Sequence, residues 1–501
     1  MQCTCAAPII VHLNSERLQI VPKNQNNPRP PSPVMFQNHL KPGRLAMFRL
    51  LGLWGGTQQI EDDKSSKEHY KIIPTTTNAE PAVTASDTKA LPLDDNLKKR
   101  LDKCEEKVFS LLLEKGVPGL VINVTKQNST IWTAAYGFCD VENQVRCSPD
   151  SRMRIASISK SIFASTVVAP LIDEYKLDIR SSIFNYLSEK EFPRPKFQGK
   201  EYDITIEQLL NHTSGIRHYE EEKSKPALRP ISSPRSLHVY QNDDQYNRVE
   251  YYTQKNYRSV TEALSVFKDS PLVREPGNYR YSSYNYTLLS AVIEKFLQEV
   301  KSNHLQIEDH WVQVLHKDWN LKETTLDHDE PILSKRARYY MRTGENGQLI
   351  NAPYVSNSVK WAGGGLISTT GDMAKLGNAL IDSYKSRNSA KISRKTMDLL
   401  WDKDAPNTYA LGFRVVKLDA KDYNDNFAVY HTGVALGASS ILLMFPESEV
   451  VVTMICNLYE TDLTSLAFFI AKQFERFPIE CPDGLSTSRT QYPTSTRDSS
   501  Y

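Results

Sequence analysis

The stretch RIASISKS (Arg154–Ser161) places Ser157 three residues before Lys160. The residues that follow, SIFASTVVAPLIDEYKLD, repeat apolar side chains at helical spacing, so Ser157 is predicted to begin a helix. At a helix start, backbone N–H groups and the helix dipole favour a developing oxyanion. Lys160 lies one turn later on the same face, and a lysine shielded from water can lose its proton near neutral pH. The pair therefore predicts a serine nucleophile activated by a lysine.

The S-x-x-K spacing occurs twice more in the chain, so the spacing alone is not specific. Ser86 and Lys89 lie in a segment without a periodic apolar pattern, where no scaffold would hold them. Ser265 and Lys268 lie in TEALSVFKDSP, which is predicted to be an ordinary helical turn without partner residues. The chemistry must therefore be sought around the first pair.

Two later segments complement the serine–lysine pair. In REPGNYRYSSYNYTLLSAVIEKF (274–296), Tyr281 stands two residues before Ser283 and ahead of a predicted helix. In YHTGVALGASSILLMFPE (430–447), an H-T-G triplet that begins at His431 lies on a predicted strand.

Taken in order, S-x-x-K, Y-S-S and H-T-G resemble the three signature elements of serine β-lactamases and penicillin-binding peptidases. The match is to the branch of class C β-lactamases, D-alanyl-D-alanine carboxypeptidases and esterases, and within it to the mitochondrial β-lactamase-related members of animals. HTSGIRHYE (212–220) and KWAGGGLIST (360–369) resemble further segments of this branch, and the resemblance covers about residues 95–477.

The resemblance implies an α/β (α+β) fold of the serine β-lactamase/DD-peptidase type. We expect an antiparallel sheet of roughly five strands, built from both chain ends and flanked by helices. A mostly helical subdomain should come from about residues 160–360, with Ser157 at the junction.

The resemblance also implies roles for individual residues. Ser157 would be the acylated nucleophile and Lys160 its hydrogen-bonded activator. Tyr281 would be the general base or proton shuttle, with a phenol pKa lowered by neighbouring cations. His431 stands where many relatives have lysine, and it would help to place a substrate carboxylate and tune Tyr281. Backbone N–H groups of Ser157 and Val434 would form the oxyanion hole.

Ser283, Thr432 and Gly433 would complete the substrate-binding part of this site, without a metal or cofactor. Two of the positions depart from the family pattern. Ser283 replaces the asparagine of Y-x-N and is too short to span the same hydrogen bond to a substrate amide. His431 removes a positive charge that lysine would carry at neutral pH. Both departures weaken recognition of a β-lactam carboxylate and leave acyl-enzyme chemistry intact, so we expect a peptidase or esterase.

Composition changes along the chain suggest three parts. Residues 1–93 form a basic leader rich in Pro, Asn, Gln, Ser and Thr, residues 94–478 the catalytic domain with a surface insertion at 218–260, and residues 479–501 a Ser/Thr-rich tail. The basic, acid-poor composition of the leader is typical of a mitochondrial presequence. A disordered basic leader without an address fits equally well, and the protein would then be cytoplasmic.

The bulk composition excludes several classes of function. A net charge of +2 with 24% charged residues predicts no nucleic-acid partner. There is no zinc-binding motif and no apolar run near the roughly 20 residues that a membrane span needs. The odd, scattered cysteines indicate free thiols in a reducing compartment rather than a disulfide framework; they are Cys3, Cys5, Cys104, Cys139, Cys147, Cys456 and Cys481.

Two interpretations of the function remain open. The first is hydrolysis of a small peptide, ester or other acyl substrate, because the nucleophile, lysine and tyrosine are all present. The second is a self-assembling scaffold with a weak or vestigial site, since the resemblance implies a homo-oligomer or filament. His212 is expected to fix a turn, and the glycines at 363–365 are expected to form a tight turn rather than a phosphate loop.

Overall fold

Seven strands form one antiparallel sheet in the order β11-β12-β13-β14-β1-β2-β3. The computed structural model describes residues 95–219, 250–301, 304–343 and 347–477, so the predicted leader and tail and most of the 218–260 insertion lie outside the described residues. The strands are β1 (Gly119–Lys126), β2 (Ser129–Asp140), β3 (Val145–Arg146), β11 (Arg414–Lys417), β12 (Phe427–Ala435), β13 (Ala438–Phe445) and β14 (Val450–Cys456).

The two ends of the described chain meet at the centre of this sheet. Strand β1 pairs with β14, with Leu120 opposite Cys456 and Lys126 opposite Val450. This pairing confirms the predicted antiparallel sheet built from both chain ends. The expected number of about five strands was too small: the edge strand β3, for example, has only two residues and leaves no clear period in the sequence.

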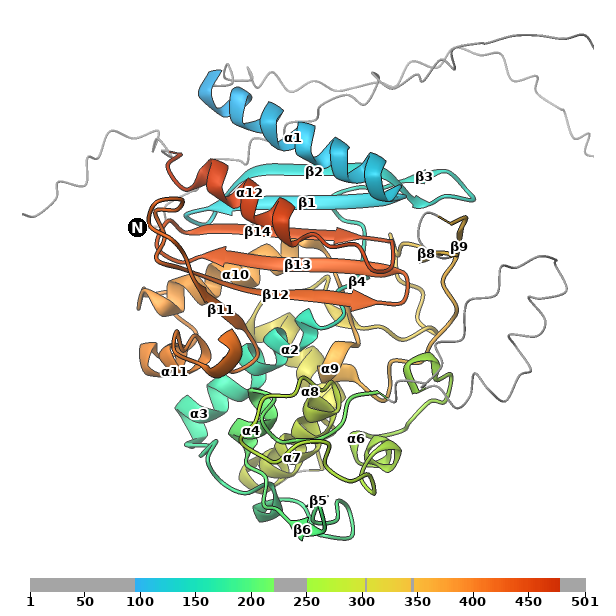
Figure 1. Cartoon of the computed structure of the whole chain (residues 1–501), viewed down its shortest axis with the longest axis vertical. Helices are drawn as coiled ribbons and strands as arrows, with labels where there is room; N and C mark the ends of the chain where they lie inside the picture. The colour runs from blue at the N-terminus through green and yellow to red at the C-terminus, as the bar shows by residue number, and fades with distance from the viewer. Residues whose placement is uncertain (1–94, 220–249, 302–303, 344–346, 478–501) are drawn as a thin grey trace, which may run out of the picture. The chain divides into compact units, whose positions relative to one another are not determined.

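Helices cover both faces of the sheet, which explains why β1, β13 and β14 are buried along their whole length. One face packs under α1 (Asp95–Lys115) and α12 (Thr464–Phe474), and the other under α10 (Thr370–Tyr384) (Figure 1). Alternate residues of β1 point to opposite layers, with Leu120 and Ile122 in the α1/α12 core and Val121 in the other. A Cβ at Gly377 of α10 would lie 2.6 Å from Val451, so glycine allows this helix to approach β14 closely.

The middle of the chain forms the expected mostly helical part. Its helices are α2 (Ile158–Phe163), α3 (Ala169–Tyr175), α4 (Ile206–Leu210), α6 (Val260–Ala263), α7 (Tyr284–Lys301), α8 (Ile307–Gln313), α9 (Trp361–Gly364) and α11 (Arg394–Leu400). Short strands accompany them: β4 (Met153–Arg154), β5 (Lys196–Phe197), β6 (Lys200–Glu201), β7 (Thr325–Leu326), β8 (Tyr340–Arg342), β9 (Leu349–Asn351) and β10 (Leu366–Ser368).

The helix predicted to follow Ser157 is interrupted. Between α2 and α3 the chain takes a π-helical turn at Ala164–Val168, just before Pro170. Proline has no amide hydrogen to continue the i→i−4 ladder, and Thr166 bonds the Ile162 carbonyl through its hydroxyl (2.7 Å). Helix α2 contacts β12 and β13, so Ser157 lies where the sheet and the helical part meet.

Candidate active site

A constrained turn presents Ser157 at the start of α2. The residue before it, Ala156, has φ = +49°, a left-handed conformation that costs free energy for any residue with a Cβ. The turn is held from both sides: the Ile155 N–H donates to the Leu366 carbonyl (3.1 Å), and the Ser440 hydroxyl donates to the Ile155 carbonyl (2.8 Å). Ser157 itself is half-buried, whereas its neighbours are buried.

Gly433 brings strand β12 against this turn. A Cβ at Gly433 would lie 2.1 Å from the Ile155 carbonyl oxygen and 2.3 Å from the Ser440 hydroxyl. Only glycine therefore lets the strand pass so close to the residues before Ser157. The next residue, Val434, has an exposed side chain at the end of β12.

Lys160 contacts Ser157 from within the protein. Its side chain is completely buried, and Nζ lies 3.1 Å from the Ser157 hydroxyl, 3.1 Å from the Ser283 hydroxyl and within hydrogen-bond reach of the Gly363 carbonyl. None of these partners carries a negative charge. Burial, with a further contribution from the charge of Lys360, holds the Lys160 pKa well below its usual value.

The buried amine fits its three partners when it is uncharged. A neutral amine has two N–H groups and one lone pair. The Gly363 carbonyl can only accept a hydrogen, and the Ser283 hydroxyl can take the second one. The lone pair then remains for the hydroxyl of Ser157.

Tyr281 lies beside the same amine, with Lys160 Nζ 4.8 Å from its ring centroid. Its pKa differs from the expectation of a phenol acidified by cations. Burial raises the pKa of Tyr281 above its ordinary value, and the opposing hydrogen bond with Ser157 and the charge of Arg414 do not reverse this. That expectation was wrong, because desolvation outweighs a cation that is not in contact with the phenol.

His431 is also buried, and both of its ring nitrogens are engaged. Nδ1 lies 2.6 Å from the Thr432 carbonyl, which can only accept, so Nδ1 carries the hydrogen. Nε2 then accepts from the phenol of Tyr409 at 2.9 Å. Burial and the nearby Lys160 lower the His431 pKa to about 3. The ring is neutral and lies 6.5 Å from that of Tyr281, centroid to centroid, so it offers no charge to a substrate carboxylate.

Two histidines hold the Y-S-S segment in place: His212, which was expected only to fix a turn, and His218, which was not singled out in the sequence. His212 is buried at φ = +62°, and its Nδ1 accepts from the Ser282 N–H (3.4 Å) and lies 3.2 Å from the Asn285 amide nitrogen. Its ring packs against Tyr281 with centroids 4.3 Å apart. The contact is between distant segments, and the sequence signal was only the short NHTSG motif (211–215).

Ser283 faces Lys160 rather than open space. Its hydroxyl bonds Lys160 and also the phenol of Tyr219, and its N–H donates to His218 Nδ1 at 3.2 Å. Burial, Lys160 and Lys360 together lower the His218 pKa to about 3. The third position of the Y-S-S triplet therefore belongs to the hydrogen-bond network of the lysine.

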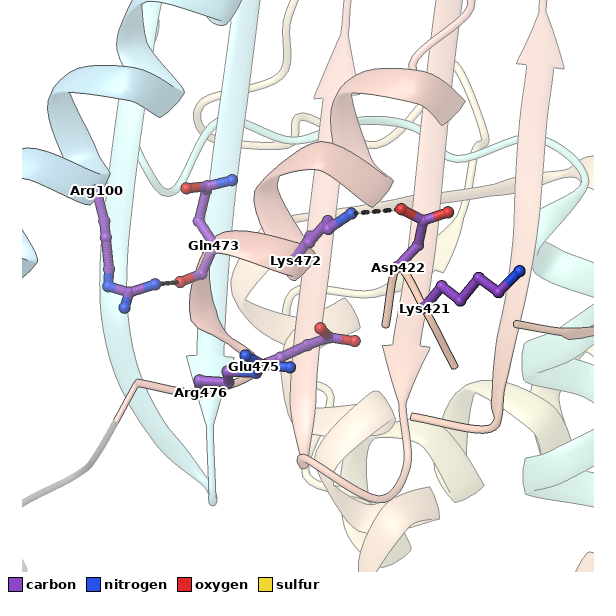
Figure 2. Close-up of a pocket in the computed structure, with 7 residues that line it drawn as sticks. All are labelled: Arg100, Lys421, Asp422, Lys472, Gln473, Glu475 and Arg476. Carbon is purple, nitrogen blue, oxygen red and sulfur yellow. Dashed lines mark hydrogen bonds and ion pairs between the residues drawn. The ribbon is translucent and has the colours of Figure 1, made fainter. Parts of the chain in front are cut away.

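A separate cavity lies elsewhere among the described residues. It has a volume of about 340 Å³ and is lined by charged side chains of α1, α12 and the segment after β11 (Figure 2). Its cations are engaged locally: Arg100 donates to the Gln473 carbonyl near the end of α12, and Lys472 pairs with Asp422 at 3.3 Å. None of its lining residues belongs to the group around Ser157, here called the Ser157 cluster, which consists of Ser157, Lys160, Tyr281, Ser283 and His431.

No three His, Cys, Asp or Glu side chains in the described part of the chain are placed to hold a metal ion. None of the helices described here combines the length and the apolar character of a membrane span.

The chain is similar to known proteins over most of its length. Residues 93–473 match the family model described as Beta-lactamase. The mouse (Mus musculus) protein named serine beta-lactamase-like protein LACTB, mitochondrial, is 30% identical, over 78% of this chain and 83% of its own length. The human (Homo sapiens) protein of the same name is also 30% identical, over 78% and 82%.

Solved structures agree on the fold. The octameric penicillin-binding protein homologue from Pyrococcus abyssi superimposes with a TM-score of 0.57 at 19% identity, covering 74% of this chain and 76% of that one. A class C beta-lactamase gives a TM-score of 0.55 at 14% identity, covering 75% and 97%. The antiparallel sheet with flanking helices is thus the β-lactamase/penicillin-binding-protein fold. Because the family model spans most of the chain and the two mammalian relatives are 30% identical to it over 78% of its length, the chain belongs to the beta-lactamase family of serine hydrolases.

Proposed function

We propose that the protein is an acyl-transfer hydrolase that works through an acyl-enzyme on Ser157. The Lys160 amine carries the proposal: it is fully buried, 3.1 Å from the Ser157 hydroxyl, and without a carboxylate partner among the described residues. Burial holds the pKa of this amine well below its usual value, so Lys160 can be uncharged near neutral pH and accept the hydroxyl proton.

In the acylation step, the Ser157 oxygen attacks the substrate carbonyl carbon while its proton passes to Lys160. The negative charge on the carbonyl oxygen would be stabilised by the N–H groups of Ser157 and Val434 and by the start of α2. The bond to the leaving group then breaks. The leaving amine or alcohol takes a proton from the Tyr281 phenol, which is replenished from Lys160.

In the deacylation step, water attacks the ester formed on Ser157. The water proton returns through the lysine and tyrosine to the serine oxygen as the acyl bond breaks. The products are a carboxylic acid and the free serine, so the cycle consumes one water for each substrate.

We favour a peptidase over an esterase on the state of Tyr281. An amine must be protonated as it leaves, and the raised pKa of this phenol keeps its proton available at neutral pH. A carboxylesterase is the alternative, because an activated alcohol can leave without that proton. The two are distinguished by comparing kcat/KM for an amide and an ester with the same acyl group.

The test of the acyl-enzyme is labelling with a fluorophosphonate. Wild-type protein should carry one adduct, on the peptide that contains Ser157, and Ser157→Ala should carry none. Ser265→Ala is the matched control from another S-x-x-K pair, since that hydroxyl donates to the Glu262 carbonyl of its own turn (2.7 Å). An adduct that persists in Ser157→Ala, or an unreactive wild type, would favour a scaffold without catalysis.

Assembly and location belong to the same proposal. A homo-oligomer is supported by the octameric relative from Pyrococcus abyssi, and light scattering of the full chain tests it. A mitochondrial location is supported by the names of the mammalian relatives and by the basic residues of the first 60 positions. A reporter fused to residues 1–60 should reach mitochondria, and Arg44→Glu with Arg49→Glu should prevent it. A cytosolic wild-type fusion would contradict the targeting role.

A further inference from the structure

Lys360 is a buried lysine whose amine has no polar partner among the described residues. It stands just before α9 and is only 6% exposed. Among the described residues its amine makes no hydrogen bond or ion pair, and instead lies 4.9 Å from the ring centroid of Tyr251 and 5.5 Å from that of Tyr219. Aromatic faces offset only part of the free energy lost when an ammonium leaves water. A cation held in this way is therefore poised to gain from an anion.

Asp327, the acid whose charge acts on Lys360, does not supply that anion. Asp327 accepts from Arg154 Nε at 2.7 Å, from Asn357 Nδ2 at 2.8 Å and from Arg336. Its two oxygens are therefore already engaged by two guanidinium groups. Burial, with a further contribution from the charge of Arg154, lowers the Lys360 pKa to about 7 despite the attraction of Asp327.

Lys360 is part of the wall that holds Lys160. Gly363, one turn later, accepts a hydrogen bond from Lys160, and its Cβ position lies 3.6 Å from the Lys360 Cβ. A second route runs from Lys160 through the Ser283 hydroxyl to the Tyr219 phenol, whose ring faces the Lys360 amine. The charge of Lys360 contributes to the lowered pKa of Lys160, so the two amines are electrostatically coupled.

We propose that Lys360 binds a carboxylate of the substrate, which makes the Ser157 site selective for acyl substrates with a free carboxylate. The inference rests on the proposed function, because it names the substrate class of that site. It also moves carboxylate recognition away from strand β12, where His431 is neutral and has both nitrogens engaged. The substrate carboxylate would form with Lys360 the ion pair that the described residues do not provide.

The test uses two esters that differ in one group, 3-carboxyphenyl phenylacetate and 3-carbamoylphenyl phenylacetate. The selectivity is the ratio of their kcat/KM values, carboxylate over carboxamide. Wild-type protein should prefer the carboxylate, and Lys360→Met should lower the ratio at least about tenfold, mainly through KM, because a desolvated ion pair is lost. The product 3-hydroxybenzoate should inhibit wild-type protein and bind Lys360→Met at least about tenfold more weakly.

Lys403→Met is the matched control. Lys403 also lies over two rings, 4.0 Å from that of Phe427 and 6.0 Å from that of Tyr384, but it is exposed and outside the Ser157 cluster. Its ratio should equal that of wild type. Fluorophosphonate labelling of Lys360→Met at Ser157 shows that the variant is folded.

The outcomes separate the two proposals. If wild type hydrolyses neither ester and takes no fluorophosphonate, the proposed function fails. If it hydrolyses both and Lys360→Met slows them equally, Lys360 only adjusts the pKa of Lys160 and the carboxylate proposal is overturned. The selectivity should also fall as pH rises through about 7, where Lys360 loses its charge. The titratable groups that act on this lysine are Lys160, His218, Arg154, Asp327 and the phenols of Tyr219 and Tyr251.

Discussion

The phenol of Tyr409 donates a hydrogen bond of 2.9 Å to Nε2 of His431, and this bond fixes the tautomer of the histidine. Burial lowers the pKa of His431 to about 3, so its ring should not titrate between pH 5 and 8. Nitrogen-15 NMR of the histidine rings, assigned by comparison with His431→Gln, measures this directly. A His431 titration near the ordinary value of 6.5 would show that the ring is far more hydrated than its 4% exposure indicates.

Tyr409→Phe removes the donor and leaves His431 Nε2 buried without its partner. The loss should lower the free energy of unfolding by about 1–3 kcal/mol, the usual cost of an unsatisfied buried polar atom. Urea denaturation at neutral pH measures it. Tyr430→Phe is the control. Tyr430 lies next to His431 on β12, and its ring packs on that of Phe468 with centroids 5.5 Å apart. Equal stability losses in the two variants would contradict the importance of the bond.

The lowered pKa of Lys160 predicts how stability depends on pH. Between its pKa in the folded protein and 10.5, the unfolded chain holds the lysine proton and the folded chain does not. Folding then releases a proton, so stability rises with pH across this window. Relative to Lys160→Met, wild type should gain up to about 1.4 kcal/mol of unfolding free energy for each pH unit within this window, below 10.5.

Denaturation curves of the two proteins at several pH values test this slope, which does not depend on the hydrogen bonds that methionine also removes. Lys403→Met, in which an exposed lysine is replaced, is the control. A constant difference between wild type and Lys160→Met across the window would mean that Lys160 stays protonated in the folded protein. Lys160 could then not be the base.

Tyr281→Phe should slow hydrolysis by about 10²–10⁴, the usual contribution of a positioned proton donor. The loss should be larger for an amide than for an ester with a good leaving group, because only the amine requires the proton. Steady-state kinetics on the two substrates measure both effects, with Tyr430→Phe as the control. If amide and ester hydrolysis slow equally, the phenol acts in a step other than protonation of the leaving group.

Gly433→Ala should disrupt the site by forcing β12 away from the turn before Ser157. The added Cβ would meet the Ile155 carbonyl at 2.1 Å, and we expect a loss of about 1–3 kcal/mol of stability with slower fluorophosphonate labelling. Gly371→Ala in α10 is the contrast: the nearest atom to its Cβ would be 3.8 Å away, so alanine should be neutral or stabilising by up to about 1 kcal/mol. Thermal melts measure the stability of both variants, and fluorophosphonate labelling rates measure the state of the site. A Gly433→Ala variant as stable and as reactive as Gly371→Ala would contradict the prediction.

The sequence by itself determined the features that depend on local spacing. The three residues between Ser157 and Lys160 bring both side chains to one face of a helical turn, wherever that turn is placed. The apolar runs that form β13 and β14 predicted strands of an antiparallel sheet, and the structure shows both strands buried along their whole length. The two-residue edge strand β3 and the π-helical turn before Pro170 were beyond this reasoning, because so few residues leave no period to recognise.

Only the tertiary structure decided the protonation states in the site. The pKa of a side chain depends on how much water and which charges surround it, and these come from segments that are far apart in the sequence. Lys160 is buried by Ser283 and Gly363, and His431 is neutral because Tyr409 and burial keep it so. The surroundings of Lys360, two aromatic rings and no polar partner among the described residues, were equally invisible in KWAGGGLIST, because they depend on segments far away in the sequence.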